Sequence, residues 1–376
     1  MEAASEQGLA EYRANHVPLY NAQPLKLGVF AINLSNHVLV SNVPTSFEMS
    51  WPHSLAIATQ VDRMGWEVIV PAARWRGYGG TANFHNRTFE TLTYAAGLLA
   101  STKQAMVFST VHVSVINPVV AAKAIATLDH ISNGRAGLNV VMGWFAEEMA
   151  MLGVVLREHG NRYDYGAEWL QVVEKLWRET EPFDFAGDYL QLKGAQADPK
   201  PIQPRPVLIN AGGSPAGIEF SARFADFNFT IFDAEEVAAA YVRRIRERAW
   251  SEYKRKIGMM TTCVVVCRDT EREAQQAYQA ILDHADWDSV RRYAAAQGLN
   301  LDNLDESQRG PIMEKFAAGA ASNPLVGTPE QVVEKFQSIK RAGIDGVLVG
   351  LVDYVEELSY FEDRVMPLMK QSGLRL

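Results

Sequence analysis

The amino-acid sequence predicts an α/β protein, a (β/α)8 TIM barrel with insertions. Eight short β-rich segments recur along the 376 residues, with segments of helical periodicity between them. Most of the β-rich segments are near-continuous apolar runs, as is typical of parallel strands covered on both faces. A TIM barrel consists of eight strands, each followed by a helix, which is the number of alternations in this sequence. A doubly wound open sheet is the alternative, but it seldom needs eight units.

The expected strands are residues 27–32, 67–71, 105–110, 136–142, 207–211, 227–231, 259–266 and 346–349. The expected helices are residues 54–64, 91–101, 118–131, 162–180, 216–224, 234–253, 269–283 and 329–342. Boundary residues support this division. Asn117-Pro118 begins one helix, which ends at the Asn133-Gly134 pair. Thr328-Pro329 begins the last helix, and Gly343 ends it before the last strand.

We expect one barrel domain at residues 25–376, preceded by an N-terminal arm at residues 1–24 that packs outside the barrel, against a neighbouring subunit. Two insertions interrupt the alternation. Residues 181–206 contain a proline-rich run, and residues 284–327 mix polar and helical character. Loops of this length in a compact domain are typical of lids or disordered segments.

Composition excludes several classes of protein. The net charge of −8 comes with no basic block, which argues against nucleic-acid binding. No run of about 18 apolar residues exists to span a membrane, and residues 1–8 lack the basic start and apolar core of a signal peptide. Cys263 and Cys267 share a strand but lie ~13 Å apart, too far for a disulfide. They indicate a reducing compartment, so we expect a cytoplasmic protein.

In such a barrel the functional site lies at the C-terminal ends of the strands, and a polar residue there faces a site rather than the core. The residues collected at those ends include amides, a hydroxyl and large aromatics, but no acid–base pair and no nucleophile with a base. They are Asn33, Asn36, Arg74, Trp75, Arg76, Thr110, His112, Asn139, Trp144, Asn228, Phe229 and Thr230.

Histidine spacing gives no sign of a metal site. His37, His53, His85, His112, His130 and His159 are scattered through the chain, without the spacing of a zinc motif. We therefore expect no metal. His112 follows the third strand and is the better candidate for the site, whereas His130 stands at a helix end, where we expect it to act as a cap.

A glycine-rich turn, Ala211-Gly212-Gly213-Ser214-Pro215, joins the fifth strand to a helix. Its glycines let the backbone approach an anion, the helix start presents free N–H groups, and Ser214 adds a hydroxyl. The plainer interpretation, a βα turn with Ser214 as N-cap, stays open. A second glycine-rich stretch at residues 76–80 lacks the Lys-Ser/Thr of a Walker motif, and we expect a mobile loop there.

With these residues placed, the chain resembles the bacterial luciferase-like superfamily over residues 25–370. Within it, the resemblance is closest to two-component FMN-dependent monooxygenases, the group that includes pyrimidine oxygenase and dimethylsulfone monooxygenase. The stretches that carry it are residues 76–80, 126–135, 139–144, 162–163, 185–189, 211–214 and 225–229.

The resemblance implies reduced FMN (FMNH2) as the cosubstrate that activates O2, delivered by a separate NAD(P)H:flavin reductase. It implies that Tyr163, Gly212, Gly213 and Ser214 hold the FMN phosphate, and that Asn139 lies near the ring. Thr110, Asn139 and Phe229 match the oxygen pocket of pyrimidine oxygenase, which favours a flavin N5-peroxide. Thr110 and Asn139 would donate hydrogen bonds to the developing anion, and Phe229 would exclude water.

The function predicted is therefore oxygenation of a small organic substrate, an N-heterocycle or cyclic amide, or a sulfone or sulfonate. Arg76, His112 and Trp144 are the expected substrate contacts. A deazaflavin-dependent hydride-transfer oxidoreductase shares the barrel and phosphate site and is one alternative. A non-catalytic flavin-binding protein is another. The resemblance also implies a homodimer or homotetramer.

Overall fold

The computed structural model describes residues 6–376 and confirms the predicted fold. Eight parallel strands close into a barrel because β8 pairs with both β7 and β9, and β1 with both β2 and β11. These strands are β1 (Lys26–Phe30), β2 (Val68–Val70), β3 (Met106–His112), β4 (Ala136–Val141), β7 (Val207–Asn210), β8 (Phe227–Phe229), β9 (Gly258–Cys267) and β11 (Gly346–Gly350). Each coincides with a predicted strand, with ends that differ by at most two residues.

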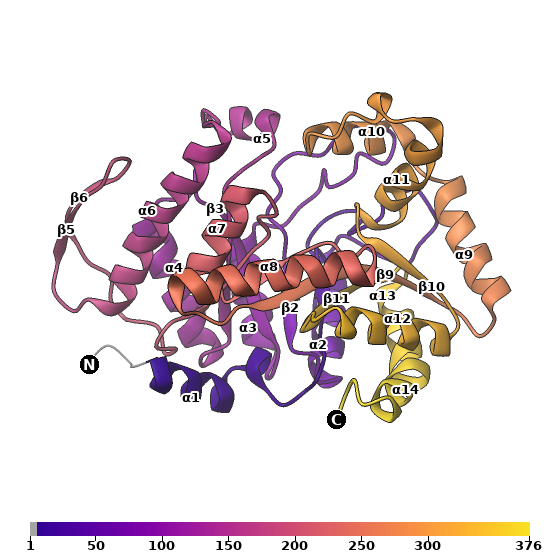
Figure 1. Ribbon diagram of the computed structural model, residues 1–376, viewed down its shortest axis with the longest axis horizontal. Coiled ribbons are helices and arrows are strands. Elements are labelled where there is room, and N and C mark those ends of the chain that lie inside the picture. Colours follow the sequence, from indigo (N-terminus) through magenta and orange to yellow (C-terminus); the bar gives the residue numbers. More distant parts are fainter. Residues whose placement is uncertain (1–5) are drawn as a thin grey trace.

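Helices cover the outside of the barrel (Figure 1). They are α2 (Trp51–Arg63), α3 (Thr91–Ser101), α4 (Pro118–Ser132), α6 (His159–Arg178), α7 (Pro215–Phe224), α8 (Glu235–Tyr253), α12 (Pro329–Arg341), α13 (Tyr354–Tyr360) and α14 (Met366–Gln371). The predicted helix at 269–283 is α9 (Glu271–Asp283), which lies with α12 between β9 and β11. The periodicity predicts nothing at α13 and α14 because both are short and a π-helical turn, Phe361–Val365, separates them.

The predicted caps are mostly confirmed. Thr328 and Gln331 form a capping box at the start of α12, and the Asn117 side chain accepts the Val119 N–H at the start of α4. Asn133 ends α4 in the left-handed conformation, with φ of 54°. The capping role expected for His130 is wrong: its Nε2 lies 2.8 Å from the Lys200 carbonyl oxygen, so it ties α4 to the proline-rich loop.

Strand alternation decides which side chains face the barrel axis. On β3, Phe108 packs in the interior with Met260 of β9, whereas Val107 and Val111 pack outward against the helices. Thr110 and His112 follow Phe108 at intervals of two, so they lie on its inner face, nearer the C-terminal end of the strand. We call the end of the barrel at which the strands terminate its upper end, or mouth, and the opposite end its lower end. Along β3 the barrel interior is therefore polar near the mouth and apolar below it.

The N-terminal segment closes the lower end of the barrel. Of the expected arm, residues 1–5 lie outside the part of the chain that the structure describes. Helix α1 (Glu6–His16) lies below the strands, and Val17 and Leu19 join the interior core with Met106 and Phe108. The segment thus packs on its own barrel.

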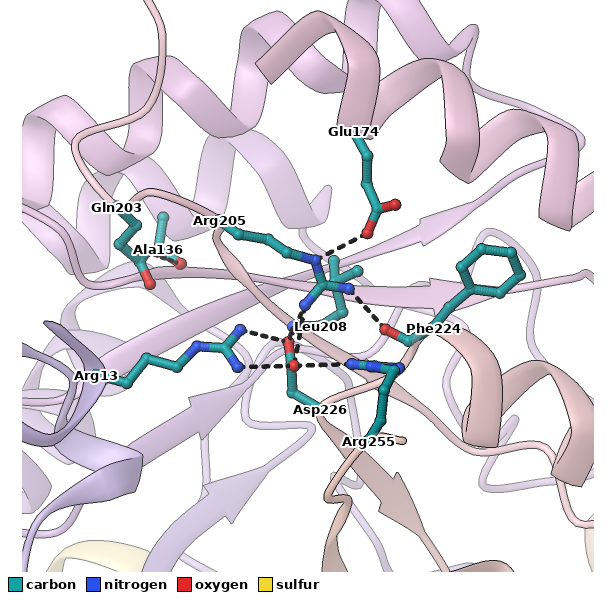
Figure 2. A network of polar contacts seen from close by, with 9 residues as sticks. All are labelled: Arg13, Ala136, Glu174, Gln203, Arg205, Leu208, Phe224, Asp226 and Arg255. Atoms are coloured by element: carbon teal, nitrogen blue, oxygen red, sulfur yellow. Dashed lines mark hydrogen bonds and ion pairs between the residues drawn. The ribbon is translucent and has the colours of Figure 1, made fainter. Parts of the chain in front are cut away.

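A network of ion pairs attaches the N-terminal segment, residues 6–24, to the barrel (Figure 2). We call this segment the N-terminal plug. The buried Asp226, just before β8, pairs with Arg13 of α1 at 2.9 Å, Arg205 at 2.7 Å and Arg255 at 3.2 Å. Burial raises the pKa of the Asp226 carboxyl, but Arg205, Arg13 and Arg255 outweigh it and lower that pKa to about 2. The network joins α1 to the segments that lead into β7, β8 and β9.

The two insertions have structure of their own. Residues 181–206 contain an antiparallel hairpin of β5 (Phe183–Ala186) and β6 (Gln191–Ala195). Residues 284–327 form α10 (Trp287–Ala296), α11 (Glu306–Gly319) and an unpredicted strand, β10 (Asn323–Gly327), which pairs with the upper half of β9. Helices α10 and α11 lie at the end of the barrel opposite α1 (Figure 1).

The second insertion packs over the loops at the barrel mouth and shares a hydrophobic core with them. Tyr293 of α10 is buried with Tyr78 and Phe84, and Ser289 Oγ donates to the Gly79 carbonyl oxygen at 2.9 Å. These contacts hold the glycine-rich loop at 76–80, where the sequence predicts a mobile one.

No helix within residues 6–376 is long and apolar enough to cross a membrane.

Replacing Asp226 with Asn should lower the free energy of unfolding by about 3–5 kcal/mol, because three arginines would lose their shared counter-charge in a buried site. Urea unfolding measures the change. Asp288→Asn is the control, because Asp288 pairs with Arg291 at 3.3 Å on the surface, where little change is expected. Equal effects of the two substitutions would contradict this role for Asp226.

Three histidines near the barrel mouth are buried, and burial lowers the pKa of His37 and His112 to about 3 and that of His85 well below 6.5. Their unfolded pKa is about 6.5. The folded state therefore takes up fewer protons, and stability falls as the pH falls below about 6.5.

We expect His85→Gln to reduce this acid sensitivity, because Gln can still donate to the His37 carbonyl oxygen, which lies 2.6 Å from His85 Nε2. Between pH values of about 6.5 and 4.5, the slope of unfolding free energy should decrease by about 1.4 kcal/mol per pH unit. Urea unfolding across this range gives the slope. The exposed His284→Gln is the control, and a slope unchanged in His85→Gln would refute the assignment.

Candidate functional site

Two neighbouring strands place an amide beside a hydroxyl at the mouth of the barrel. Thr110 of β3 and Asn139 of β4 are direct partners in the sheet register. Asn139 Nδ2 donates to Thr110 Oγ1 at 3.0 Å, and Thr110 Oγ1 donates to the Pro71 carbonyl oxygen at 2.5 Å. The Thr110 proton is thus engaged with the backbone, so Thr110 orients the amide, and one N–H of Asn139 remains for a ligand.

Phe229 supplies the apolar part of the same interior surface. It ends β8, two residues after the inward-facing Phe227, and lies 6.3 Å from Phe30 between ring centroids. The structure therefore brings Thr110, Asn139 and Phe229 to the upper interior of one barrel, as the resemblance implies. A hydrogen-bond donor and an aromatic surface within one barrel interior suit a polar ring that must be kept from water.

The glycine-rich turn after β7 makes a cradle at the start of α7. Ser214 is the N-cap, and its Oγ accepts the Gly217 N–H at 3.1 Å. A Cβ added to Gly212 would lie 2.8 Å from Tyr163 Oη and 2.6 Å from Gly217 Cα. Only glycine permits this approach, which seats the Tyr163 hydroxyl against the turn, within hydrogen-bonding reach of Ser214.

Helix α6 adds two residues to the cradle that the sequence analysis does not assign to it. His159 Nε2 lies 2.8 Å from Ser214 Oγ, and an Arg162 Nη lies 3.0 Å from His159 Nδ1. Arg162 also donates to the Gly143 carbonyl oxygen at 2.7 Å. Arg162 precedes Tyr163 in a stretch that carries the resemblance, so its place was detectable. His159 gave no signal because its partner is 55 residues away.

These groups fit a phosphate. One arginine, two hydroxyls, a histidine and the N-terminus of α7 surround a turn whose Gly213 has nothing within 4 Å of its Cβ position. The N–H groups of the first helical turn have no partners within a helix, apart from capping contacts such as that of Gly217. The N-cap role of Ser214 is therefore compatible with the anion-binding role that the sequence predicts.

Some candidates are structural instead. Asn228 alternates outward on β8, and its side chain donates to Ser221 Oγ at 2.9 Å and accepts from Tyr241 Oη at 3.0 Å, behind the cradle. Asn33 Nδ2 donates to the carbonyl oxygens of Ala72 and Phe89 at 2.9 and 3.0 Å. Their amides are fully engaged with the protein, so they support the loops of the site.

One wall of the mouth combines aromatic rings with a buried ion pair. The Arg74 guanidinium lies 4.9 Å from the Trp144 ring centroid and pairs with Glu148 at 3.0 Å. His112 lies in this wall, where burial and the Arg74 charge lower its pKa to about 3, so its imidazole is neutral. A small cavity lies between Thr110, His112 and Trp75. Arg76 is set apart: it is half-exposed and pairs with Glu147.

Among residues 6–376, no group of three His, Cys, Asp or Glu side chains could hold a metal ion. Cys263 and Cys267 are both free and buried, and burial raises the pKa of each thiol. The polar chemistry of the mouth therefore rests on amides, hydroxyls, a neutral imidazole and paired charges.

The fold and the cradle define a TIM-barrel protein whose C-terminal face carries a group of side chains and backbone N–H groups that fit an anion. More narrowly, the chain belongs to the luciferase-like monooxygenase family, whose sequence description matches residues 26–346.

Relatives match over nearly their whole length. The FMNH2-dependent dimethylsulfone monooxygenase of Pseudomonas fluorescens is 30% identical over 357 residues, which cover 93% of this chain and 95% of that protein. The pyrimidine monooxygenase RutA of Acinetobacter baylyi is 30% identical, covering 92% and 95%. The solved structure of a riboflavin lyase with modified FMN and riboflavin superposes with a TM-score of 0.84 at 25% identity, covering 94% of this chain and 93% of that one.

Proposed function

We propose that this protein is a two-component FMN-dependent monooxygenase. It would take reduced FMN from a separate NAD(P)H:flavin reductase and use O2 to oxygenate a small organic substrate. The observation that carries the proposal is that one end of one barrel holds both a cradle that fits a phosphate and the Thr110–Asn139 pair, with Phe229 in the same barrel interior. The relatives named for dependence on FMNH2 support the same cofactor.

The cradle would hold the FMN phosphate. Arg162 supplies positive charge, Ser214 and Tyr163 supply hydroxyl donors, and Gly212 and Gly213 allow close approach of the backbone. His159, between Arg162 and Ser214, would complete the hydrogen-bond chain. The phosphate would thereby anchor one end of the cofactor at α7.

The flavin ring would lie at the barrel mouth near Asn139. Bound reduced FMN supplies the electrons that activate O2 for transfer to the substrate. Thr110 fixes the Asn139 amide through the 3.0 Å hydrogen bond, so that the remaining amide N–H is already oriented toward developing negative charge. Phe229 and Phe30 pack together in the same barrel interior and would limit access of water to the ring.

The substrate would contact His112 and Trp144, which belong to the aromatic wall of the barrel mouth described above. Arg76, the third expected contact, would reach the substrate only from the rim, because it is half-exposed and paired with Glu147. We keep N-heterocycles or cyclic amides and sulfones or sulfonates as candidate substrates. We further propose a cytoplasmic homodimer or homotetramer, with residues 25–376 as one functional barrel.

The alternatives differ in oxygen use. A deazaflavin-dependent hydride-transfer enzyme would use the same cradle but would not consume O2, and the Thr110–Asn139 pair gives it no evident advantage. A flavin-storage protein would bind oxidised FMN tightly and show no turnover.

The deciding experiment is anaerobic titration with reduced FMN, followed by rapid mixing with oxygenated buffer and detection by near-ultraviolet and visible absorbance. We expect tight binding of reduced FMN and a transient oxygen adduct that returns slowly to oxidised FMN. Absence of both would reject the monooxygenase and favour the deazaflavin enzyme. Tight binding of oxidised FMN without an adduct would favour storage.

Thr110→Val should uncouple flavin oxidation from oxygenation. The change keeps the side-chain shape but removes the oxygen that accepts from Asn139, so the amide loses its fixed orientation. We expect product per FMNH2 oxidised to fall about tenfold, the effect of one hydrogen bond, with a matching rise in released hydrogen peroxide. Ser109→Ala is the control, because Ser109 precedes Thr110 on β3 but faces outward. Coupling that is the same in both variants would remove Thr110 from this role.

A further inference from the structure

The ion pair in the wall of the mouth is buried on both sides. The side chains of Arg74 and Glu148 are 9% and 0% exposed, and Arg74 Nη1 lies 3.0 Å from Glu148 Oε2. The other Glu148 oxygen accepts the Trp75 backbone N–H at 2.6 Å. Two independent contacts therefore hold Glu148 in place. One is to the Arg74 guanidinium, and the other is to the backbone of the next residue, Trp75.

The guanidinium itself is packed within aromatic side chains. Its Cζ lies 4.9 Å from the Trp144 ring centroid and 5.6 Å from that of Tyr78. Arg74 Nε and Tyr78 Oη are buried atoms without a hydrogen-bond partner within the described chain. Two polar atoms of the wall thus lack a partner within the described chain, although the charge of Arg74 is already matched by that of Glu148.

Two other positive charges around the mouth, those of Arg76 and Arg162, are engaged elsewhere, and a third, that of Arg292, lies at the surface. Arg76 pairs with Glu147 at 3.2 Å near the surface, and Arg162 belongs to the cradle. Arg292 of α10 is exposed, next to Gly79. His112 carries no charge near neutral pH, because burial and the charge of Arg74 lower its pKa to about 3.

An anionic substrate against this wall would meet the Glu148 carboxylate as well as Arg74. It would either be repelled or have to displace a buried carboxylate that would then be left unpaired, which is costly. An uncharged substrate leaves the pair intact, can stack on Trp144 and can use the unpartnered polar atoms.

We propose that Glu148 neutralises Arg74 and thereby makes the site selective for uncharged, oxygen-bearing substrates, such as a cyclic amide, an N-heterocycle or a sulfone, over sulfonates and carboxylates. Glu148 is a positioning residue that acts through Arg74. This inference rests on the proposed function and narrows the substrates proposed there.

The test compares matched neutral and anionic ligands: uracil with orotate, dimethylsulfone with methanesulfonate, and benzamide with benzoate. Binding is measured by calorimetric titration of the flavin-free protein. In the unaltered protein, the neutral member of a pair should bind at least about tenfold more tightly than its anion. Glu148→Gln keeps an acceptor for the Trp75 N–H but leaves the Arg74 charge unpaired, so it should gain binding of the anions by about tenfold or more.

Two further variants distinguish an effect of charge on ligand binding from an effect of a damaged fold. Glu147→Gln alters the adjacent exposed carboxylate and should keep the preference of the unaltered protein. Arg74→Gln combined with Glu148→Gln removes both charges and should bind anions no better than the unaltered protein. Circular dichroism and thermal unfolding confirm that each variant is folded.

Tighter binding of an anion than of its neutral partner by the unaltered protein would overturn the proposal. So would anion binding by Glu148→Gln that is no stronger than that by Glu147→Gln, including no anion binding by either. If Glu148→Gln does not fold, the proposal is accepted or rejected on whether the unaltered protein binds neutral ligands more tightly than their anions. These measurements need neither flavin nor oxygen, so they fail independently of the oxygen-adduct experiment.

Discussion

The cost of burying a carboxylate governs both ends of this barrel. At the lower end, Asp226 is surrounded by Arg13, Arg205 and Arg255, and Glu67 pairs with Arg375 at 2.8 Å. Each of these pairs joins segments distant in the sequence, because a buried charge must find its partner wherever the fold supplies one. The lower end is thereby closed by the N-terminal plug and by the C-terminal residues together.

At the upper end the same requirement has a chemical consequence. Glu148 satisfies Arg74, and burial keeps His112 neutral, so the wall of the mouth carries polarity without net charge. The cradle at α7 differs, because Arg162 there contacts a histidine and a carbonyl oxygen but no carboxylate of residues 6–376. Under the proposed function, the site for the anionic phosphate and the site for the substrate would thus lie on one set of strands but differ in charge.

Much of the site was predictable because its residues follow strand ends in the sequence. Thr110, Asn139 and Phe229 were placed by their strands, and Gly212 to Ser214 by the turn chemistry. Asn228 was misjudged, since one residue of register separates an inward side chain from an outward one. Glu148 and His159 went unassigned, because their roles come from contacts with Arg74 and Ser214, 74 and 55 residues away.

By itself, the sequence determined the eight strands, the helices with strong periodicity and caps, and the family. These properties are local: apolar runs, turn residues and short ordered motifs encode them without reference to distant parts of the chain. The tertiary structure alone decided that the N-terminal segment plugs its own barrel, that residues 284–327 pack over the mouth, and which charges are paired. Those outcomes depend on burial and on contacts between distant residues, and no local pattern specifies them.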